Sequence, residues 1–262
     1  MNHFLASLWA EILKMRRSKV PLFTALGFSF VPLAGGLFMV ILKDPEAARS
    51  MGLISAKAQL VAGVADWATF FSILAQGAAV GGAILFAIVT AWVFGREFTD
   101  RTAKELLALP TSRESIVAAK FVVIAIWTFL LTVWIFLVGL VVGKLVVIPG
   151  WSQELLRSAS LDVAGAAFLT IALLPFVAFF AGFGHGELPA IGWTILTVVL
   201  AQVAAITGWG DWFPWSVPAL FSGAAGPRAE LMGYHSYTIV IFASLAGLAL
   251  TFFWWRNADQ TG

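Results

Sequence analysis

The chain has 262 residues, of which 60% are hydrophobic and 11% are charged, and its mean hydropathy is +0.92. Soluble domains carry about 25% charged residues, so this composition excludes a large soluble domain and predicts a single all-α transmembrane domain over residues 1–262. The net charge of +2 gives no reason to expect a nucleic-acid partner, and the absence of Cys excludes disulfides, thiol catalysis and Cys-ligated zinc.

The first 19 residues predict an amphipathic helix that lies in the membrane surface. Apolar side chains recur at helical spacing on one side, and the other side carries Ser7, Glu11, Lys14 and Arg17. A signal peptide is the alternative interpretation. The apolar run over 20–42 is longer than a signal core and lacks a small-residue cleavage site, so we interpret it as the first span.

Five further apolar runs are long enough to cross a bilayer as helices. They predict spans at about 67–94, 116–142, 160–183, 189–207 and 237–255. Small residues around Gly77 to Ala83 predict that another helix approaches the second span closely. Pro32 predicts a bend within the first span, and Pro175 lies inside the fourth span.

A polar segment at residues 95–115 separates the second and third spans. Three pairs of opposite charges in it are each four residues apart, namely Glu97 with Arg101, Asp100 with Lys104, and Arg101 with Glu105. This spacing predicts ion pairs along one short amphipathic helix from Glu97 to Leu109. On the pattern alone, a solvated loop that keeps two spans apart explains the segment equally well.

The end of this segment carries helix stop and start signals. Pro110 is expected to end the short helix, because proline lacks the N–H that a continuing helix needs. Thr111 and Glu114 have the spacing of a capping box for the next helix.

Residues 208–236 form a second unusual segment, because they are rich in aromatic residues but contain no full-length apolar run. Trp209, Trp212 and Trp215 lie here among Gly and Pro. The pattern predicts an outer re-entrant hairpin of short helices that enters the bilayer part way.

Charge predicts the orientation of the six spans. If the N-terminus is cytoplasmic, ten Lys and Arg residues lie inside and six lie outside, as the positive-inside rule favours. Both termini and residues 95–115 are then expected in the cytoplasm, and the Trp-rich hairpin outside.

No catalytic, nucleotide-binding or metal site is expected in the chain. Gly139 to Lys144 has too few residues between its glycines for a phosphate-binding loop, and Leu145 replaces the required Ser or Thr. His3, His185 and His235 lie in three separate segments and cannot form a zinc motif. The span centres carry no charge, which counts against a proton-coupled or ion-coupled transporter.

The polar segment resembles the cytoplasmic loop of type-2 ABC transporter permeases. The resemblance is carried, in order, by Glu97, Thr102, Leu106, Leu107, Pro110, Ser112, Arg113 and Lys120. It implies a coupling helix that docks on a separate ATPase subunit. The implied coupling residues are Glu97, Asp100, Arg101, Thr102, Lys104, Glu105, Pro110, Ser112 and Arg113.

The resemblance also implies a location in a bacterial plasma membrane, the assembly and the activity. Two permease subunits, as a homodimer or a heterodimer, are expected with two ATPase subunits that bind ATP and Mg, and with membrane lipid around them. We expect export of an apolar or amphipathic cargo, such as a drug, a lipid-like molecule or an antimicrobial peptide. An immunity or scaffold protein that does not use ATP, and a secondary transporter, are the alternatives.

Overall fold

The computed structural model describes residues 3–44, 64–107, 111–226 and 232–257, and within these ranges it contains helices and no strand. Among these described residues, six helical segments are long and apolar enough to cross a membrane. They are α2 (Val20–Lys43), α5 (Trp67–Gln76) continued by α6 (Gly82–Thr99), α8 (Arg113–Leu145), α9 (Gln153–Ala172) continued by α10 (Leu174–Phe183), α11 (Glu187–Thr207) and α13 (Tyr234–Asn257). The expected all-α membrane fold is thereby confirmed.

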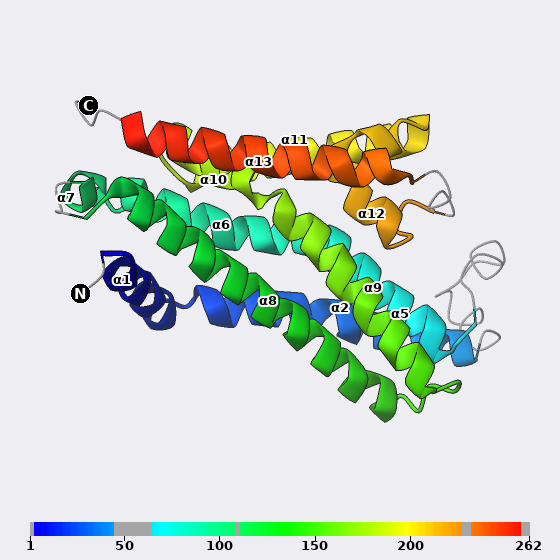
Figure 1. Ribbon diagram of the computed structural model, residues 1–262. Helices are drawn as coiled ribbons and strands as arrows, with labels where there is room; N and C mark the ends of the chain where they lie inside the picture. The colour runs from blue at the N-terminus through cyan, green and yellow to red at the C-terminus, as the bar shows by residue number, and fades with distance from the viewer. Residues whose placement is uncertain (1–2, 45–63, 108–110, 227–231, 258–262) are drawn as a thin grey trace.

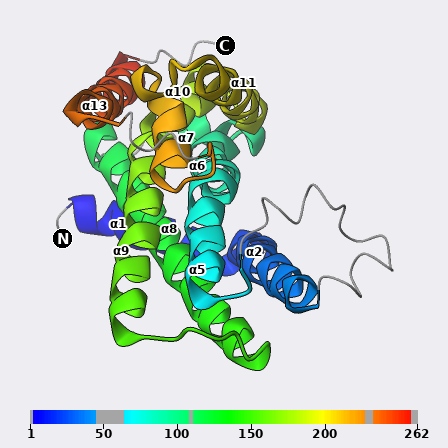
Figure 2. The ribbon, with the colours of Figure 1, turned by 90° about the vertical axis from the view of Figure 1, so that its right-hand side faces the viewer.

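The membrane-crossing helices run side by side, and they begin and end at two opposite ends of the bundle (Figure 1). One end holds α1 (His3–Arg17), α7 (Ala103–Leu107) and the last turn of α13. The other end holds α12 (Val217–Phe221), which Figure 2 shows near the middle of the bundle. The polar segment and the two ends of the described chain therefore share one end. Its cytoplasmic location stays a prediction from the charge count.

The second crossing is irregular in its middle, where the π-helix η1 (Gly77–Gly81) joins α5 to α6. A Cβ atom on Gly77 would collide with the side chain of Val31 in α2. The small residues here therefore allow the close helix approach that the sequence predicted.

The fourth crossing is longer than predicted and is broken. Its helix begins at Gln153 rather than near residue 160, because the side chain of Ser152 accepts a hydrogen bond from the backbone N–H of Leu155 and caps a polar first turn. Pro175 lies in the first turn of α10, and the two helices meet at Leu173. A proline inside a span breaks the backbone ladder at that point.

The Trp-rich segment folds into two 3₁₀ turns, η2 (Gly210–Trp212) and η3 (Pro214–Ser216), followed by α12. Its three Trp side chains differ: Trp209 and Trp212 are exposed, whereas Trp215 packs on Trp193 of α11. A bond of 3.0 Å between Asp211 Oδ2 and Nε2 of His235 holds the segment to the first turn of α13.

The surface helix α1 is oriented differently from the prediction. Glu11, expected on the polar side of the surface helix, is buried, as is Met15, while Trp9 is 63% exposed. Helix α1 packs extensively on α8. The prediction was wrong because Glu11 has buried partners of opposite charge in the bundle, described below.

Candidate functional site

The polar segment between α6 and α8 is a tight turn, not one helix from Glu97 to Leu109. Helix α6 ends at Thr99, where the backbone N–H of Thr102 donates to the carbonyl oxygen of Glu97 at 2.9 Å, and that of Arg101 donates to Phe98 at 3.1 Å. These bonds form a Schellman cap. Its left-handed position is Arg101, with φ of 58°, a position that usually holds Gly. The prediction failed because no Gly marks the stop.

This reversal separates the charges that were expected to pair. The predicted ion pairs of Arg101 with Glu97 and Glu105, and of Asp100 with Lys104, do not form among the residues that the structure describes. Asp100 instead lies 3.7 Å from Arg96, one turn earlier in α6. Four charged side chains of the turn and of α7 are exposed: Asp100, Arg101, Lys104 and Glu105.

Beneath the turn lies a cluster of four charged side chains, Glu11, Lys14, Glu97 and Lys120, which we call the charge cluster. Oε1 of Glu97 lies 2.7 Å from Nζ of Lys14 and 3.2 Å from Nζ of Lys120. The carboxylate of Glu11 bridges the same two lysines. Its Oε1 lies 2.8 Å from Nζ of Lys14, and its Oε2 lies 3.3 Å from Nζ of Lys120. The other carboxylate oxygen of Glu97 accepts a hydrogen bond of 2.8 Å from the hydroxyl of Thr102.

The charge cluster is electrically balanced and almost dry. Its two carboxylates and two ammonium groups sum to zero, and the side chain of Lys120 is fully buried, whereas that of Lys14 is 27% exposed. Lys120 also donates to the carbonyl oxygen of Val93 at 2.7 Å. Buried charges of this kind need partners, because desolvation of an unpaired charge costs several kcal/mol.

Lys14 stays protonated at neutral pH. Burial lowers the pKa of Lys14, but the charges of Glu11 and Glu97 and their hydrogen bonds outweigh that effect, so the pKa lies above its ordinary value. Lys14 therefore keeps its positive charge within the charge cluster at physiological pH. It joins α1, α6 and α8 directly below the turn.

The turn also rests on the far half of the bundle. The ring of Phe98 contacts His185, between α10 and α11, and Trp254 and Trp255 of α13. Gly95 approaches this half so closely that a Cβ atom on it would lie 2.7 Å from the backbone nitrogen of Glu187. A displacement of the turn would therefore be felt by helices from both halves.

Helix α8 begins one residue later than the predicted capping box. Ser112, not Thr111, is the N-cap, and its side-chain oxygen accepts from the backbone N–H of Ser115. The guanidinium of Arg113 donates to the carbonyl oxygens of Trp255 and Arg256 at 3.3 and 3.0 Å, which ties the start of α8 to the end of α13. Pro110 lies outside the described residues.

The predicted coupling residues thus divide into two groups. The exposed group is Asp100, Arg101, Lys104, Glu105 and Ser112, whereas Thr102 and Arg113 are partly buried and Glu97 is buried. Glu97 is placed to hold the turn rather than to touch another protein. Its partners were missed, although a Lys inside the predicted third span is a signal that a buried carboxylate lies nearby.

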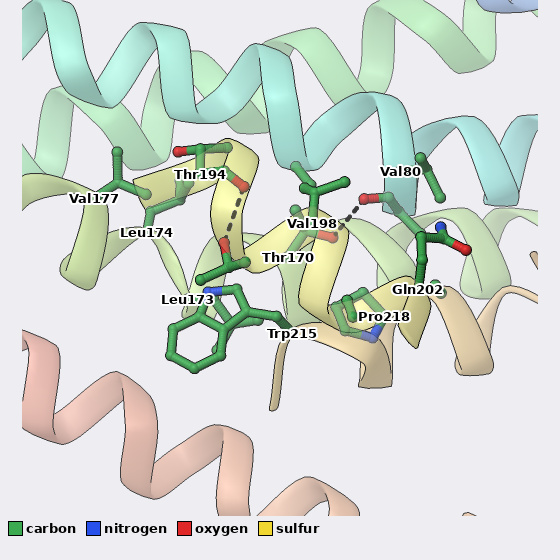
Figure 3. Close-up of a pocket in the computed structure, with 15 residues that line it drawn as sticks. Val80, Thr170, Leu173, Leu174, Val177, Thr194, Val198, Gln202, Trp215 and Pro218 are labelled. Carbon is green, nitrogen blue, oxygen red and sulfur yellow. Dashed lines mark hydrogen bonds between the residues drawn. The ribbon is translucent and has the colours of Figure 1, made fainter. Parts of the chain in front are cut away.

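A second candidate lies in the membrane-spanning part, where a cavity of about 50 Å³ is lined by residues of η1, α6, α9, α10, α11 and the Trp-rich segment. Trp215 and Gln202 line it beside Thr170, whose hydroxyl lies 3.4 Å from the carbonyl oxygen of Ala79 in η1 (Figure 3). A cavity of this size holds one or two water molecules, whereas drug-sized ligands occupy pockets of about 300–1,000 Å³. This cavity is therefore too small to be a cargo site.

Comparison with known proteins agrees with the architecture. The family model described as ABC-2 family transporter protein matches residues 7–202, which include the whole charge cluster and the turn. Bacitracin transport permease protein BCRB of Bacillus licheniformis is 28% identical over 180 residues, which cover 68% of this chain and 85% of that protein. No solved structure gives a significant match. The family match extends over most of the chain and agrees with the six apolar helices, so the chain belongs to the ABC-2 family of transporter proteins, as a membrane-spanning permease subunit.

Proposed function

We propose that this permease subunit works in an ATP-driven exporter and moves an apolar or amphipathic cargo outward. The observation that carries the proposal is the exposed turn of Asp100 and Arg101, followed by α7 with Lys104 and Glu105, mounted on the buried charge cluster. This arrangement offers charged groups to a partner and has a stiff base. The partner is an ABC ATPase subunit, in two copies, which binds ATP and Mg.

The turn receives force from the ATPase in this proposal. Closure of two ATPase subunits on ATP would push on the turn and on α7, and the charge cluster would carry the displacement into α1, α6 and α8. Both ion pairs of Lys120 are buried, so they resist such a load better than exposed pairs, which contribute about 0–1 kcal/mol. The orientation required is that of cytoplasmic termini, as the charge count favours.

The cargo path is proposed to lie between two permease subunits. The cavity beside Trp215, about 50 Å³, is too small for a cargo. One side of α2 exposes a row of large apolar side chains, namely Leu22, Phe23, Leu26, Phe30, Leu33 and Leu37. A surface of this kind is suited to lipid, to a second permease subunit, identical or different, and to apolar cargo.

The cargo class follows from the same surfaces. Uncharged apolar helix faces offer no partner to a multiply charged solute, and a drug, a lipid-like molecule or an antimicrobial peptide fits them. The relative in Bacillus licheniformis is named for bacitracin transport, so bacitracin is the first cargo to test here.

The test is reconstitution of the chain with its ATPase subunit in liposomes, followed by measurement of ATP hydrolysis and of cargo movement. The double change Arg101→Glu with Lys104→Glu should abolish stimulation of ATP hydrolysis by the permease and weaken co-purification of the two subunits. The matched control is Lys144→Glu, which alters an exposed Lys at the opposite end of α8. Stimulation that survives the double change would refute the assigned docking surface, and movement of bacitracin inward would refute export.

A further inference from the structure

An apolar groove runs between the surface helix and two spans, apart from the turn. Its volume is about 450 Å³. The lining comes from three helices and includes Ile12 and Met15 of α1, Leu22 of α2, and Val123, Ile126 and Leu130 of α8. The residues from α8 share one face and extend over about 10 Å of the helix at 1.5 Å per residue. The groove is therefore elongated along a span.

The polar groups of the groove lie at one end. Arg16 and Ser18, near the connection between α1 and α2, line it together with the apolar residues. Arg17 and Lys19 are close in sequence, and all three cations of this connection are exposed. In the described part of the chain none of the three has a carboxylate within ion-pair distance, in contrast to Lys14, which has two.

We propose that the groove is a binding site for one anionic phospholipid. The phosphate lies at Arg16, whose guanidinium can donate two parallel hydrogen bonds to phosphate oxygens. An acyl chain of the same lipid lies along Val123, Ile126 and Leu130. This occupant satisfies both features of the groove, since it is anionic where the groove is basic and apolar where the groove is apolar.

Charge also decides against a second copy of the chain as the occupant. A two-fold contact centred on the groove would bring the same surface patch of both copies together. Arg16, Arg17 and Lys19 of the two copies would then lie against one another without carboxylates, and like charges in contact are repulsive. A bilayer surface that contains anionic lipid instead attracts such basic clusters.

The bound lipid would brace the helix pair that supports the turn. On α1, the groove residues Ile12 and Met15 directly follow Glu11 and Lys14 of the charge cluster, and on α8 the groove begins one turn after Lys120. The charge cluster joins α1 to α8. A lipid in the groove therefore fills the space between the same two helices, next to the charge cluster. Anionic lipid is expected to raise the thermal stability of this end of the bundle.

The experiment uses the full-length chain, purified in detergent and stripped of lipid. Binding of phosphatidylglycerol and of phosphatidylcholine with identical acyl chains is measured by native mass spectrometry. The wild-type chain should retain phosphatidylglycerol preferentially. Arg16→Gln should lower its affinity about fivefold, whereas Arg157→Gln, at an exposed Arg of α9, should leave it unchanged.

A second pair of variants tests the apolar part. Ile126→Trp fills the groove and should reduce binding of the lipid strongly, whereas Ile195→Trp, at an exposed Ile of α11, should not. If Ile126→Trp lowers the melting temperature below that of its control, Leu130→Trp replaces it.

Three outcomes would overturn the proposal. They are unchanged phosphatidylglycerol binding in the groove-filled chain, equal retention of the two lipids by the wild-type chain, and a shift in oligomeric state caused by the groove-filling change. The last would assign the groove to a protein contact.

Discussion

Replacement of Lys120 by Met should destabilise the protein strongly. The change keeps the length and apolar stem of the side chain but removes the ammonium group that lies 3.3 Å from Glu11 and 3.2 Å from Glu97. Two buried carboxylates then share Lys14 alone, and the carbonyl oxygen of Val93 loses its donor. The balanced cluster becomes a buried net charge of −1.

The size of the effect follows from burial. Removal of one partner from a buried ion pair costs about 3–5 kcal/mol, and the full burial of Lys120 means that water cannot replace it. The equivalent change at Lys14 should cost less, because that side chain is 27% exposed. For a domain of this length, a loss of about 3–5 kcal/mol lowers the melting temperature by about 10 °C.

The measurement is the melting temperature of the purified chain, followed by Trp fluorescence. The control is Lys144→Met on the same helix, since Lys144 is exposed. The double change Lys120→Met with Glu97→Gln leaves the pair of Glu11 and Lys14, which is neutral. Its cost should therefore be smaller than the sum of the two single costs.

Two results would refute this reasoning. If Lys120→Met melted like Lys144→Met, the charge cluster would not contribute to the fold. The second is a double variant whose loss of stability equals the sum of the losses in the two single variants. In that case Lys120 and Glu97 would not act as a pair.

Three further changes test the turn and its supports. Gly95→Ala should lower the free energy of unfolding by about 1–3 kcal/mol, because the added Cβ meets backbone atoms. Gly192→Ala is the control and should be neutral or stabilising, because the space around Gly192 is open. The melting temperatures of the two variants distinguish these outcomes. Ser112→Ala should lower the free energy of unfolding by about 1 kcal/mol, because α8 loses its N-cap. Thr111→Ala should lower it by less. Equal losses in the two variants would contradict Ser112 as the cap. Arg101→Gly should stabilise the chain slightly by relieving its positive φ, and a lower melting temperature would contradict this.

The membrane fold could be read from the sequence because apolar length is a strong signal. Runs of 20 or more apolar residues specify bilayer-spanning helices almost without regard to their neighbours. The family resemblance of the polar segment was likewise readable from residues such as Glu97 and Thr102, and the family match agrees with it.

The geometry of the polar segment could not be read in the same way. Helical spacing of opposite charges predicted pairs within one helix, but Glu97 gains more from Lys14 and Lys120, which are distant in sequence. That choice leaves Arg101 in a left-handed conformation that only tertiary contacts can stabilise. A periodicity argument compares neighbours along one helix and does not detect partners on others.

The orientation of α1 shows the same limit. Amphipathic spacing identified the helix correctly, and it placed Glu11 on the polar side, away from the apolar contacts. Glu11 faces the bundle instead, because Lys120 lies inside α8 and needs a second carboxylate beside Glu97. Recognition of Lys120 as a buried charge would have indicated that a carboxylate from another helix lies against it.

The charge cluster also constrains how a push on the turn can be transmitted. Helix α6 cannot move away from α8 at this end without separating Glu97 from Lys120, and α8 cannot move away from α1 without separating Lys120 from Glu11. Each separation leaves a buried charge without a partner, and this raises the free energy of the protein sharply. We therefore expect α1, α6 and α8 to move together at this end during transport. The relative movement should occur farther along the second and fourth crossings, where η1 and the junction of α9 with α10 interrupt the helices beside the small cavity.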